Sequence, residues 1–155
     1  MVPIEFWELM SYVVTVLGLP LAIAVFLYEK RKERIAEEEE VYESVAASYQ
    51  DFLRLALDNP DLRLLSKART HELSDEQRER MLAIFGLLVA IFERAYLLLY
   101  EDDLGGKQAR RWRSWEDFMQ EWCARDDFRE ALPHLLEGED PEFAGYLGRL
   151  VEAAQ

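Results

Sequence analysis

The segment LMSYVVTVLGLPLAIAVFLY, residues 9–28, contains twenty consecutive residues without a charged side chain. An α-helix rises about 1.5 Å per residue, so a helix of this length covers roughly 30 Å, the thickness of the hydrocarbon core of a bilayer. Trp7 and Tyr28 lie at the two ends, where aromatic rings favour the membrane–water interfaces. The run predicts a transmembrane anchor within residues 1–28.

Charged residues on either side of this run predict its orientation. Only Glu5 and Glu8 carry charged side chains before it. Four basic side chains follow it closely: Lys30, Arg31, Lys32 and Arg34. Because the cytoplasmic flanks of membrane helices are enriched in Lys and Arg, we expect a single-pass protein with its N-terminus outside. A charged stalk at residues 29–40 and a cytoplasmic helical domain at residues 41–155 then follow.

Two other interpretations of the run stay open, a cleaved signal peptide and a buried core helix. Ala22-Ile23-Ala24 resembles a cleavage site, but a signal peptide carries positive charge before its apolar stretch, where this chain is acidic. A core helix of this length normally has a polar face, and here only Ser11, Tyr12 and Thr15 are polar. Retention as a membrane anchor is therefore the interpretation that we carry forward.

The composition limits the partners of the cytoplasmic domain. The 155 residues carry a formal net charge of −13. Residues 1–34 contribute none of it, because four acidic side chains cancel four basic ones. A domain this acidic is repelled by nucleic acid and by anionic lipid, so nucleic acid is not expected as a partner. Cys123 is the only cysteine, so no internal disulfide forms, as is usual in a reducing compartment.

Apolar residues beyond the stalk recur at helical spacing, without the alternation of strands. No Gly or Pro lies between Tyr28 and Asn59, so the membrane helix, the stalk and the first cytoplasmic helix are predicted to form one rod that ends before Asn59-Pro60. Ser74 and Gln77 form a capping box for a second helix, and Asp140-Pro141 begins the last. The predicted fold is all-α: one transmembrane helix continuous with a stalk helix and a cytoplasmic bundle of about five helices.

The segment MLAIFGLLVAIF, residues 81–92, is apolar on every side. Twelve residues are too few to span a bilayer, so such a helix belongs at the centre of a bundle or at a subunit interface. We expect it to pack against the Trp115–Trp122 face and against Tyr49 and Phe52. The predicted core residues are Ile84, Phe85, Leu88, Ile91 and Phe92. Of the charged pair that follows, Glu93 is expected to bind a neighbour and Arg94 to reach solvent.

No motif for catalysis or metal binding is present in the sequence. His71 and His134 are far apart, and neither has metal-ligand spacing. Cys123 has no nearby His, and no Ser lies in a Gly-x-Ser-x-Gly turn. Acidic pairs lie at helix boundaries, where carboxylates ordinarily cap helices. We therefore expect no enzyme activity, no cofactor and no metal site.

One constellation lies in the predicted membrane helix. Its small, hydroxylated and acidic members recur at steps of three and four: Glu8, Ser11, Thr15, Gly18 and Ala22. Small residues allow membrane helices to approach closely, and hydroxyl groups bond between them. This seam predicts a homo-oligomer in which a ring of Glu8 carboxylates favours cations. The alternative is a chance stripe, which any span of this length contains.

A second group of residues in the sequence places several cationic side chains close to one tryptophan. We call it the Arg–Trp cluster: Lys107, Arg110, Arg111, Trp112 and Arg113. Arg binds phosphate and stacks on bases, so the cluster fits a phosphate or a nucleotide. Two other interpretations stay open, ion pairing with the acidic run Glu37–Glu40 and contact with lipid headgroups.

Several segments of the chain together resemble a known type of protein. They are the apolar run, the Lys/Arg/Glu stalk, Tyr49-Gln50-Asp51-Phe52-Leu53, Asn59-Pro60-Asp61-Leu62-Arg63, Trp112-x-x-Trp115 and Phe128-Arg129-Glu130. These resemble segments of bacterial single-pass inner-membrane proteins with a small helical cytoplasmic domain. The resemblance implies an anchored helical domain and no particular activity, so no catalytic or binding residue is carried over from it.

Three functional hypotheses follow from the sequence. The first is a membrane-anchored, non-enzymatic interaction module that forms homo-oligomers or recruits a cytoplasmic protein. The second is a small homo-oligomeric pore or membrane effector that its cytoplasmic domain gates. The third is an anchored ligand sensor that uses the Arg–Trp cluster. Membrane lipid is a partner in all three.

Overall fold

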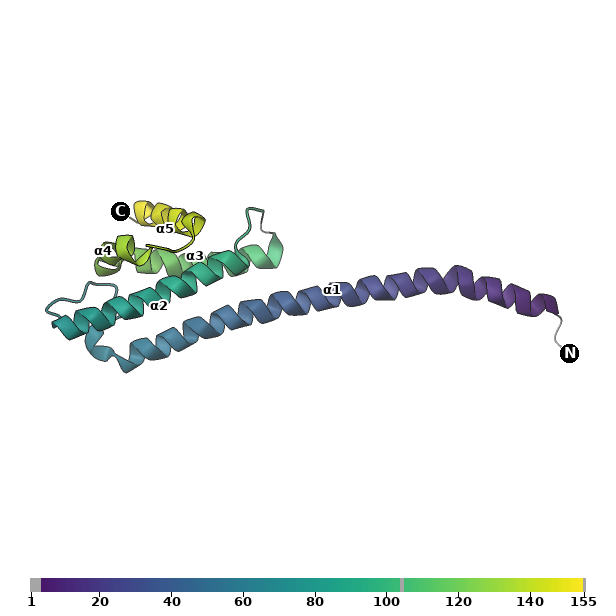
Figure 1. Ribbon diagram of the computed structural model, residues 1–155, viewed down its shortest axis with the longest axis horizontal. Helices are drawn as coiled ribbons and strands as arrows, with labels where there is room; N and C mark the ends of the chain where they lie inside the picture. The colour runs from purple at the N-terminus through teal and green to yellow at the C-terminus, as the bar shows by residue number, and fades with distance from the viewer. Residues whose placement is uncertain (1–3, 104, 155) are drawn as a thin grey trace. The chain divides into compact units, whose positions relative to one another are not determined.

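The computed structural model describes residues 4–103 and 105–154, with side chains for residues 12, 16–103 and 105–154 (Figure 1). Within these ranges the chain forms five α-helices, one short 3-10 helix and no strand, which confirms the predicted all-α class. The elements are α1 (Ile4–Asp58), η1 (Pro60–Leu62), α2 (Asp75–Leu99), α3 (Gly106–Cys123), α4 (Asp126–Leu135) and α5 (Pro141–Ala153). The chain divides into two compact units, residues 1–41 and residues 42–155.

Helix α1 runs without interruption from Ile4 to Asp58, with Pro20 inside it. It ends at Asn59-Pro60, because the residue before a proline is disfavoured in the α conformation. The Asn59 side chain also donates a hydrogen bond of 2.8 Å to the carbonyl oxygen of Leu55, in the last turn. The predicted continuity of this helix and its predicted end before Asn59-Pro60 are confirmed.

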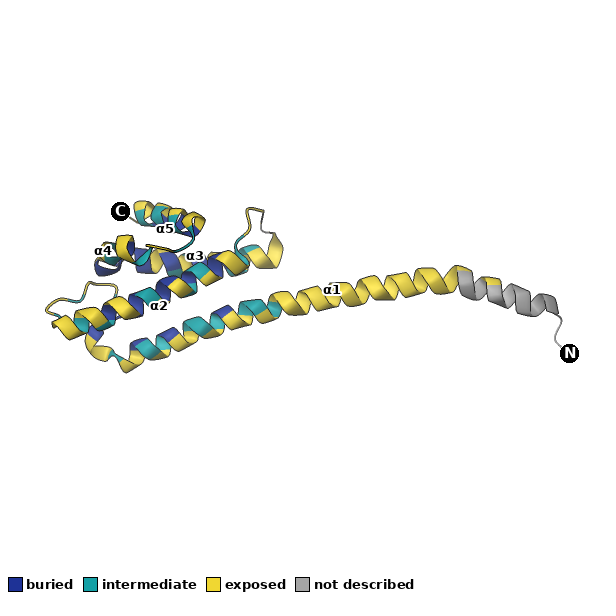
Figure 2. Cartoon of the chain, in the orientation of Figure 1, coloured by how far each residue is buried: buried dark blue, intermediate teal, exposed yellow. Residues whose placement is uncertain are grey.

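Residues 42–58 of α1 pack with α2 to α5 around one hydrophobic core. This part of α1 is antiparallel to α2: Tyr49 lies 6.4 Å from Phe92, centroid to centroid, whereas Asn59 accepts a hydrogen bond from Arg80. Helix α2 packs against α3, α4 and α5 on its other sides. In Figure 2 the buried residues of this unit lie mainly where these helices face one another.

Local capping fixes where two of these helices begin. The backbone N–H of Gln77 donates to Ser74 Oγ at 3.2 Å, and the N–H of Ser74 donates to Gln77 Oε1 at 2.9 Å, so the predicted capping box of α2 is confirmed. Asp140 Oδ1 accepts from the N–H groups of Glu142 and Phe143, both at 2.9 Å, and caps α5. Each cap satisfies backbone donors that a helix N-terminus leaves unpaired.

Helix α2 supplies the centre of the core. Four of the five predicted core residues are at most 4% exposed: Ile84, Phe85, Leu88 and Phe92. Ile91 is only half-buried and packs at the border of the core. Trp122 of α3 lies edge-on to Phe52 and to Phe85, with centroid distances of 5.4 and 6.1 Å. The predicted packing of α2 against the aromatic face of α3 is confirmed.

Among the described residues, α2 is the one helix whose length and composition would suit a membrane span. It is nevertheless packed against neighbouring helices over part of its surface. Glu93 accepts a hydrogen bond of 2.6 Å from the backbone N–H of Asp140, and Arg94 is exposed. We therefore assign α2 to the core of the helical domain. The N-terminal anchor stays a prediction, because most of its outer half lies outside the described side chains.

Phe92→Ala should lower the free energy of unfolding of the fragment 35–155 by about 3–5 kcal/mol, since removal of a buried ring leaves a cavity. Urea unfolding followed by Trp fluorescence measures this change. Leu57→Ala, at a side chain that is 64% exposed, is the control and should cost less than about 1 kcal/mol. Equal effects of the two substitutions would show that Phe92 is not a core residue.

Candidate functional site

In the described part of the predicted anchor, large apolar side chains are exposed and are not packed against other described residues. Its large apolar side chains are between 48% and 70% exposed: Val16, Leu17, Leu19, Leu21, Ile23, Val25, Phe26, Leu27 and Tyr28. Soluble monomers rarely leave contiguous apolar surface of this extent in water. Lipid or another protein chain is therefore needed to cover it.

The other predicted features of α1 are placed only in part. The basic side chains that follow Tyr28 are all exposed, and Lys30 forms an ion pair of 3.4 Å with Glu33. In the predicted seam, Gly18 and Ala22 are exposed, and a Cβ atom on Gly18 would meet no other group within 4 Å. The side chains of the remaining seam members, Glu8, Ser11 and Thr15, lie outside the described residues. The seam stays a prediction.

The structure divides the Arg–Trp cluster between the core and the surface. Trp112 is 6% exposed, and its indole lies 5.1 Å from the ring of Tyr100 and 5.7 Å from that of Tyr146. Arg111 lies over the ring of Tyr42 at 4.3 Å, a cation–π contact within the domain. The indole is therefore covered by other rings of the protein, and its face is not open to a base.

The remaining cations of the cluster differ in their surroundings. Lys107, like Arg111, interacts with other groups of the chain. Arg110 and Arg113 are exposed, and neither guanidinium has a polar partner among the residues that the structure describes. The cluster is therefore two separate solvent-facing arginines beside two engaged cations.

Arg113 borders a shallow pocket of about 310 Å³ where the segment that follows α2 meets α3 and α5. Its polar lining includes three carboxylates: Glu101, Asp102 and Glu116. The hydroxyl of Tyr146 donates to Glu116 Oε1 at 2.6 Å, and burial, followed by this carboxylate, raises the pKa of Tyr146. Because carboxylates outnumber the single guanidinium, the pocket disfavours a phosphate.

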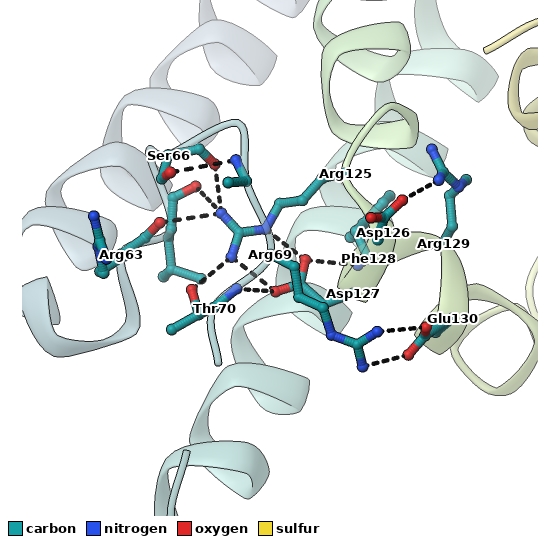
Figure 3. A network of polar contacts seen from close by, with 12 residues as sticks. Arg63, Ser66, Arg69, Thr70, Arg125, Asp126, Asp127, Phe128, Arg129 and Glu130 are labelled. Carbon is teal, nitrogen blue, oxygen red and sulfur yellow. Dashed lines mark hydrogen bonds and ion pairs between the residues drawn. The ribbon is translucent and has the colours of Figure 1, made fainter. Parts of the chain in front are cut away.

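A buried ion pair that the sequence did not reveal lies where α3 meets α4 (Figure 3). Arg125 Nε donates to Asp127 Oδ1 at 2.6 Å, and Nη2 donates to Oδ2 at 2.8 Å. The two residues are 2% and 8% exposed. Burial alone would raise the pKa of Asp127, but hydrogen bonds from Arg125 and from the N–H groups of Thr70 and Phe128 hold it below its ordinary value.

The remaining donors of Arg125 hold the segment that connects η1 to α2. Nη2 donates to Thr70 Oγ1 at 3.0 Å, and the Thr70 hydroxyl donates to the carbonyl oxygen of Leu62 at 2.7 Å. Nη1 donates at 2.6 to 3.0 Å to three carbonyl oxygens: those of Arg63, Leu64 and Ser66. Every donor of Arg125 is used within the protein, so the pair holds the fold and leaves nothing for a ligand. No local indication of this network is present in the sequence, because the first of the carbonyl groups that Arg125 binds lies 62 residues before it.

Groups with catalytic potential are either buried or isolated. Cys123 is fully buried, and burial raises the pKa of its thiol to about 12, so the thiolate is not formed at neutral pH. His71 and His134 are exposed, and His134 lies 3.8 Å from Glu137. Among the described residues, no group of His, Cys, Asp and Glu is arranged to hold a metal ion.

One pair of carboxyl groups shares a hydrogen bond near the start of α5. Glu93, which accepts from the N–H of Asp140, is also hydrogen-bonded to Glu139. That hydrogen bond raises the pKa of Glu139 above its ordinary value, with smaller contributions from burial and from the charge of Glu93. A proton is therefore held more tightly here in the folded chain than in the unfolded chain.

No protein family, curated protein or solved structure matches this chain. Functional inference therefore has to come from its own residues.

Arg125→Met should lower the free energy of unfolding by about 3–5 kcal/mol, because it leaves the buried Asp127 carboxylate without its cation and removes one donor from each of three carbonyl groups. Chemical denaturation of the fragment 35–155 measures the loss. Arg69→Met is the matched control: Arg69 binds Glu130 at 2.6 Å with its side chain 40% exposed, and an exposed pair contributes about 0–1 kcal/mol. Similar losses for both variants would show that the Arg125 network does not hold the fold.

Glu139→Gln should raise the melting temperature at pH 7 and leave it unchanged near pH 4. Because the pKa of Glu139 is raised in the folded state, the stability that its protonated form contributes is complete below the unfolded pKa of about 4.3 and is lost as the pH rises through the folded pKa. Gln mimics the protonated carboxyl at every pH. Melting curves across this range test the effect, and Glu152→Gln measures the contribution of net charge alone. A constant offset between Glu139→Gln and wild type at all pH values would contradict the shared proton.

Proposed function

We propose that the protein is a non-enzymatic interaction module anchored in a membrane by the N-terminal part of α1. The observation that carries the proposal is the uncovered apolar surface between Val16 and Tyr28. The helical domain at residues 42–155 completes a core of its own and does not need that surface. Residues 9–28 then lie in the bilayer, where lipid covers an apolar surface at no cost.

The orientation rests on charge. Lys30, Arg31, Lys32 and Arg34 are all exposed directly after the apolar run, which supports a cytoplasmic location for everything that follows. The N-terminus then lies outside the membrane and the helical domain lies inside the cell.

An interaction module agrees better with the domain than the other two hypotheses. A ligand sensor would use the Arg–Trp cluster, whose indole is covered and whose neighbouring pocket is acidic. A pore would be lined by the seam, and only Gly18 and Ala22 of that seam are described. The domain does present exposed leucines, among them Leu87, Leu97 and Leu98, which are 49% to 57% exposed. Exposed apolar side chains of this kind suit a protein partner.

Extraction of membranes with alkaline carbonate tests the anchor. Wild-type protein should stay in the pellet, whereas Leu17→Arg/Leu21→Arg should move to the supernatant, because each arginine costs about 2.5–3.5 kcal/mol near the centre of a membrane helix. Leu57→Arg/Leu65→Arg is the matched control, since these leucines of the domain are also exposed, by 64% and 55%, and it should stay in the pellet. Release of the wild-type protein would overturn the proposal.

A further inference from the structure

We propose that the pocket beside Trp112 binds an organic cation, that is, an ammonium or guanidinium group carried on an apolar stem. A free amine and a lysine or arginine side chain of a protein partner share this chemistry. Binding at this pocket uses no part of the anchor, and the second source would make it a contact of the proposed interaction module. We call it the acidic–aromatic pocket, and six of its residues carry the argument: Tyr100, Trp112, Tyr146, Glu101, Asp102 and Glu116.

Three aromatic rings supply the apolar part of this pocket, whose volume is about 310 Å³. Tyr100 directly follows α2, Trp112 belongs to α3 and Tyr146 to α5. Their centroids are 5.1 to 5.7 Å apart, and the rings are inclined to one another by 52° to 62°. Rings inclined in this way form no parallel slot for a planar base. They form an uneven apolar surface, on which the methylene groups of a flexible stem can pack.

The phenol groups of two of these rings position carboxylates at the border of the apolar surface. The hydroxyl of Tyr146 donates to Glu116 Oε1 at 2.6 Å, and the hydroxyl of Tyr100 donates to Asp102 Oδ1 at 3.4 Å. A carboxylate has about four acceptor sites on its two oxygens, and each of these bonds occupies one of them. Acceptors for a ligand therefore remain beside the rings.

The charge of the lining selects the class of ligand. Three carboxylates lie at the pocket against one guanidinium, that of Arg113, which leaves an excess of two negative charges. Among the described residues, no group of His, Cys, Asp and Glu is arranged to hold a metal ion. The ligands of Mg²⁺ or Ca²⁺ must converge to within about 2.6 Å of the ion, whereas an extended organic cation can interact with carboxylates that lie apart while its stem covers the rings. The net charge of −13 also attracts cations.

Arg113 borders the pocket and carries a group of the kind that the pocket binds. It precedes Glu116 by three residues on α3, so the two side chains lie on the same side of the helix. A cationic ligand is repelled by this guanidinium, and its removal should therefore strengthen binding. Arg110, one turn earlier on α3, is also exposed but does not line the pocket.

The indole N–H resonances of the full-length chain in an uncharged detergent report on the pocket, because one of the four tryptophans lines it. Titration with n-butylammonium at constant ionic strength should shift the signal of Trp112, assigned with Trp112→Phe, and leave those of Trp115 and Trp122 unchanged. n-Butanol has the same stem without a charge, and Mg²⁺ has charge without a stem, so neither should cause this shift. Because the pocket is shallow and exposed ionic contacts contribute little, we expect a dissociation constant of about 1–10 mM.

Matched substitutions separate the pocket from the charge of the whole domain. Glu116→Gln keeps an acceptor for the Tyr146 hydroxyl but removes one negative charge, so it should weaken binding about fivefold. Glu152→Gln makes the same change of charge at an exposed residue of α5 and should weaken binding less than about twofold. Arg113→Gln should strengthen binding several-fold, whereas Arg110→Gln should have little effect. Misfolding cannot explain a gain of affinity.

A second probe identifies the source of the cation. The peptide acetyl-Gly-Lys-Gly-amide presents the same ammonium group on the same butyl stem within a polypeptide. Tighter binding of the peptide than of n-butylammonium assigns the pocket to a lysine side chain of a protein partner. Equal or weaker binding of the peptide assigns it to a free amine.

Three results would overturn the cation site. They are a shift of the Trp112 signal by n-butanol or Mg²⁺ as large as that by n-butylammonium, no shift by n-butylammonium up to about 100 mM, or equal effects of each pocket substitution and its control. Each can occur while the wild-type protein stays in the carbonate pellet, so failure of this inference is distinguishable from failure of the anchor.

Discussion

A helix that is apolar around its whole circumference needs neighbours on every side, and α2 imposes this requirement on the rest of the domain. Residues 42–58 of α1 cover one side of α2, and α3, α4 and α5 pack against further sides of it. The neighbouring helices are amphipathic: each packs an apolar stripe against α2 and keeps most of its charged side chains on the outside. One stripe of α2, which includes Leu87 and Leu97, is not covered by these helices.

Packing of the helices leaves one long connection, between η1 and α2, that is mostly too polar to join the core. A single side chain, Arg125, holds it by binding three of its carbonyl groups while Asp127 balances the buried charge. Desolvating two ions is costly, and good geometry with every donor satisfied offsets that cost. The pair therefore fixes the connection that leads into α2 beside the start of α4, in addition to the apolar contacts of α2 itself.

Two kinds of uncovered apolar surface occur in one chain, and they differ in chemistry. Between Val16 and Tyr28 the described surface of α1 carries no charge on any side, which suits a lipid environment that has no partners for ions. On α2 the uncovered stripe around Leu87 and Leu97 is narrow and includes charged side chains such as Glu79 and Arg94, which suits a protein partner. This contrast supports an anchored domain whose cytoplasmic part meets another protein, and it leaves the Arg–Trp cluster a lesser role than its composition indicated.

Local signals in the sequence determined the all-α class, the continuous α1, its end at Asn59-Pro60, the capping box at Ser74 and the buried residues Ile84, Phe85, Leu88 and Phe92. Each depends on periodicity or capping among residues a few positions apart, and such patterns are legible without knowing the fold. Tertiary structure alone decided that Trp112 turns into the core, that Ile91 lies at its border, and that Arg125 reaches the carbonyl of Arg63. Those outcomes depend on which helices become neighbours, and residues some sixty positions apart carry no local sign that they will meet.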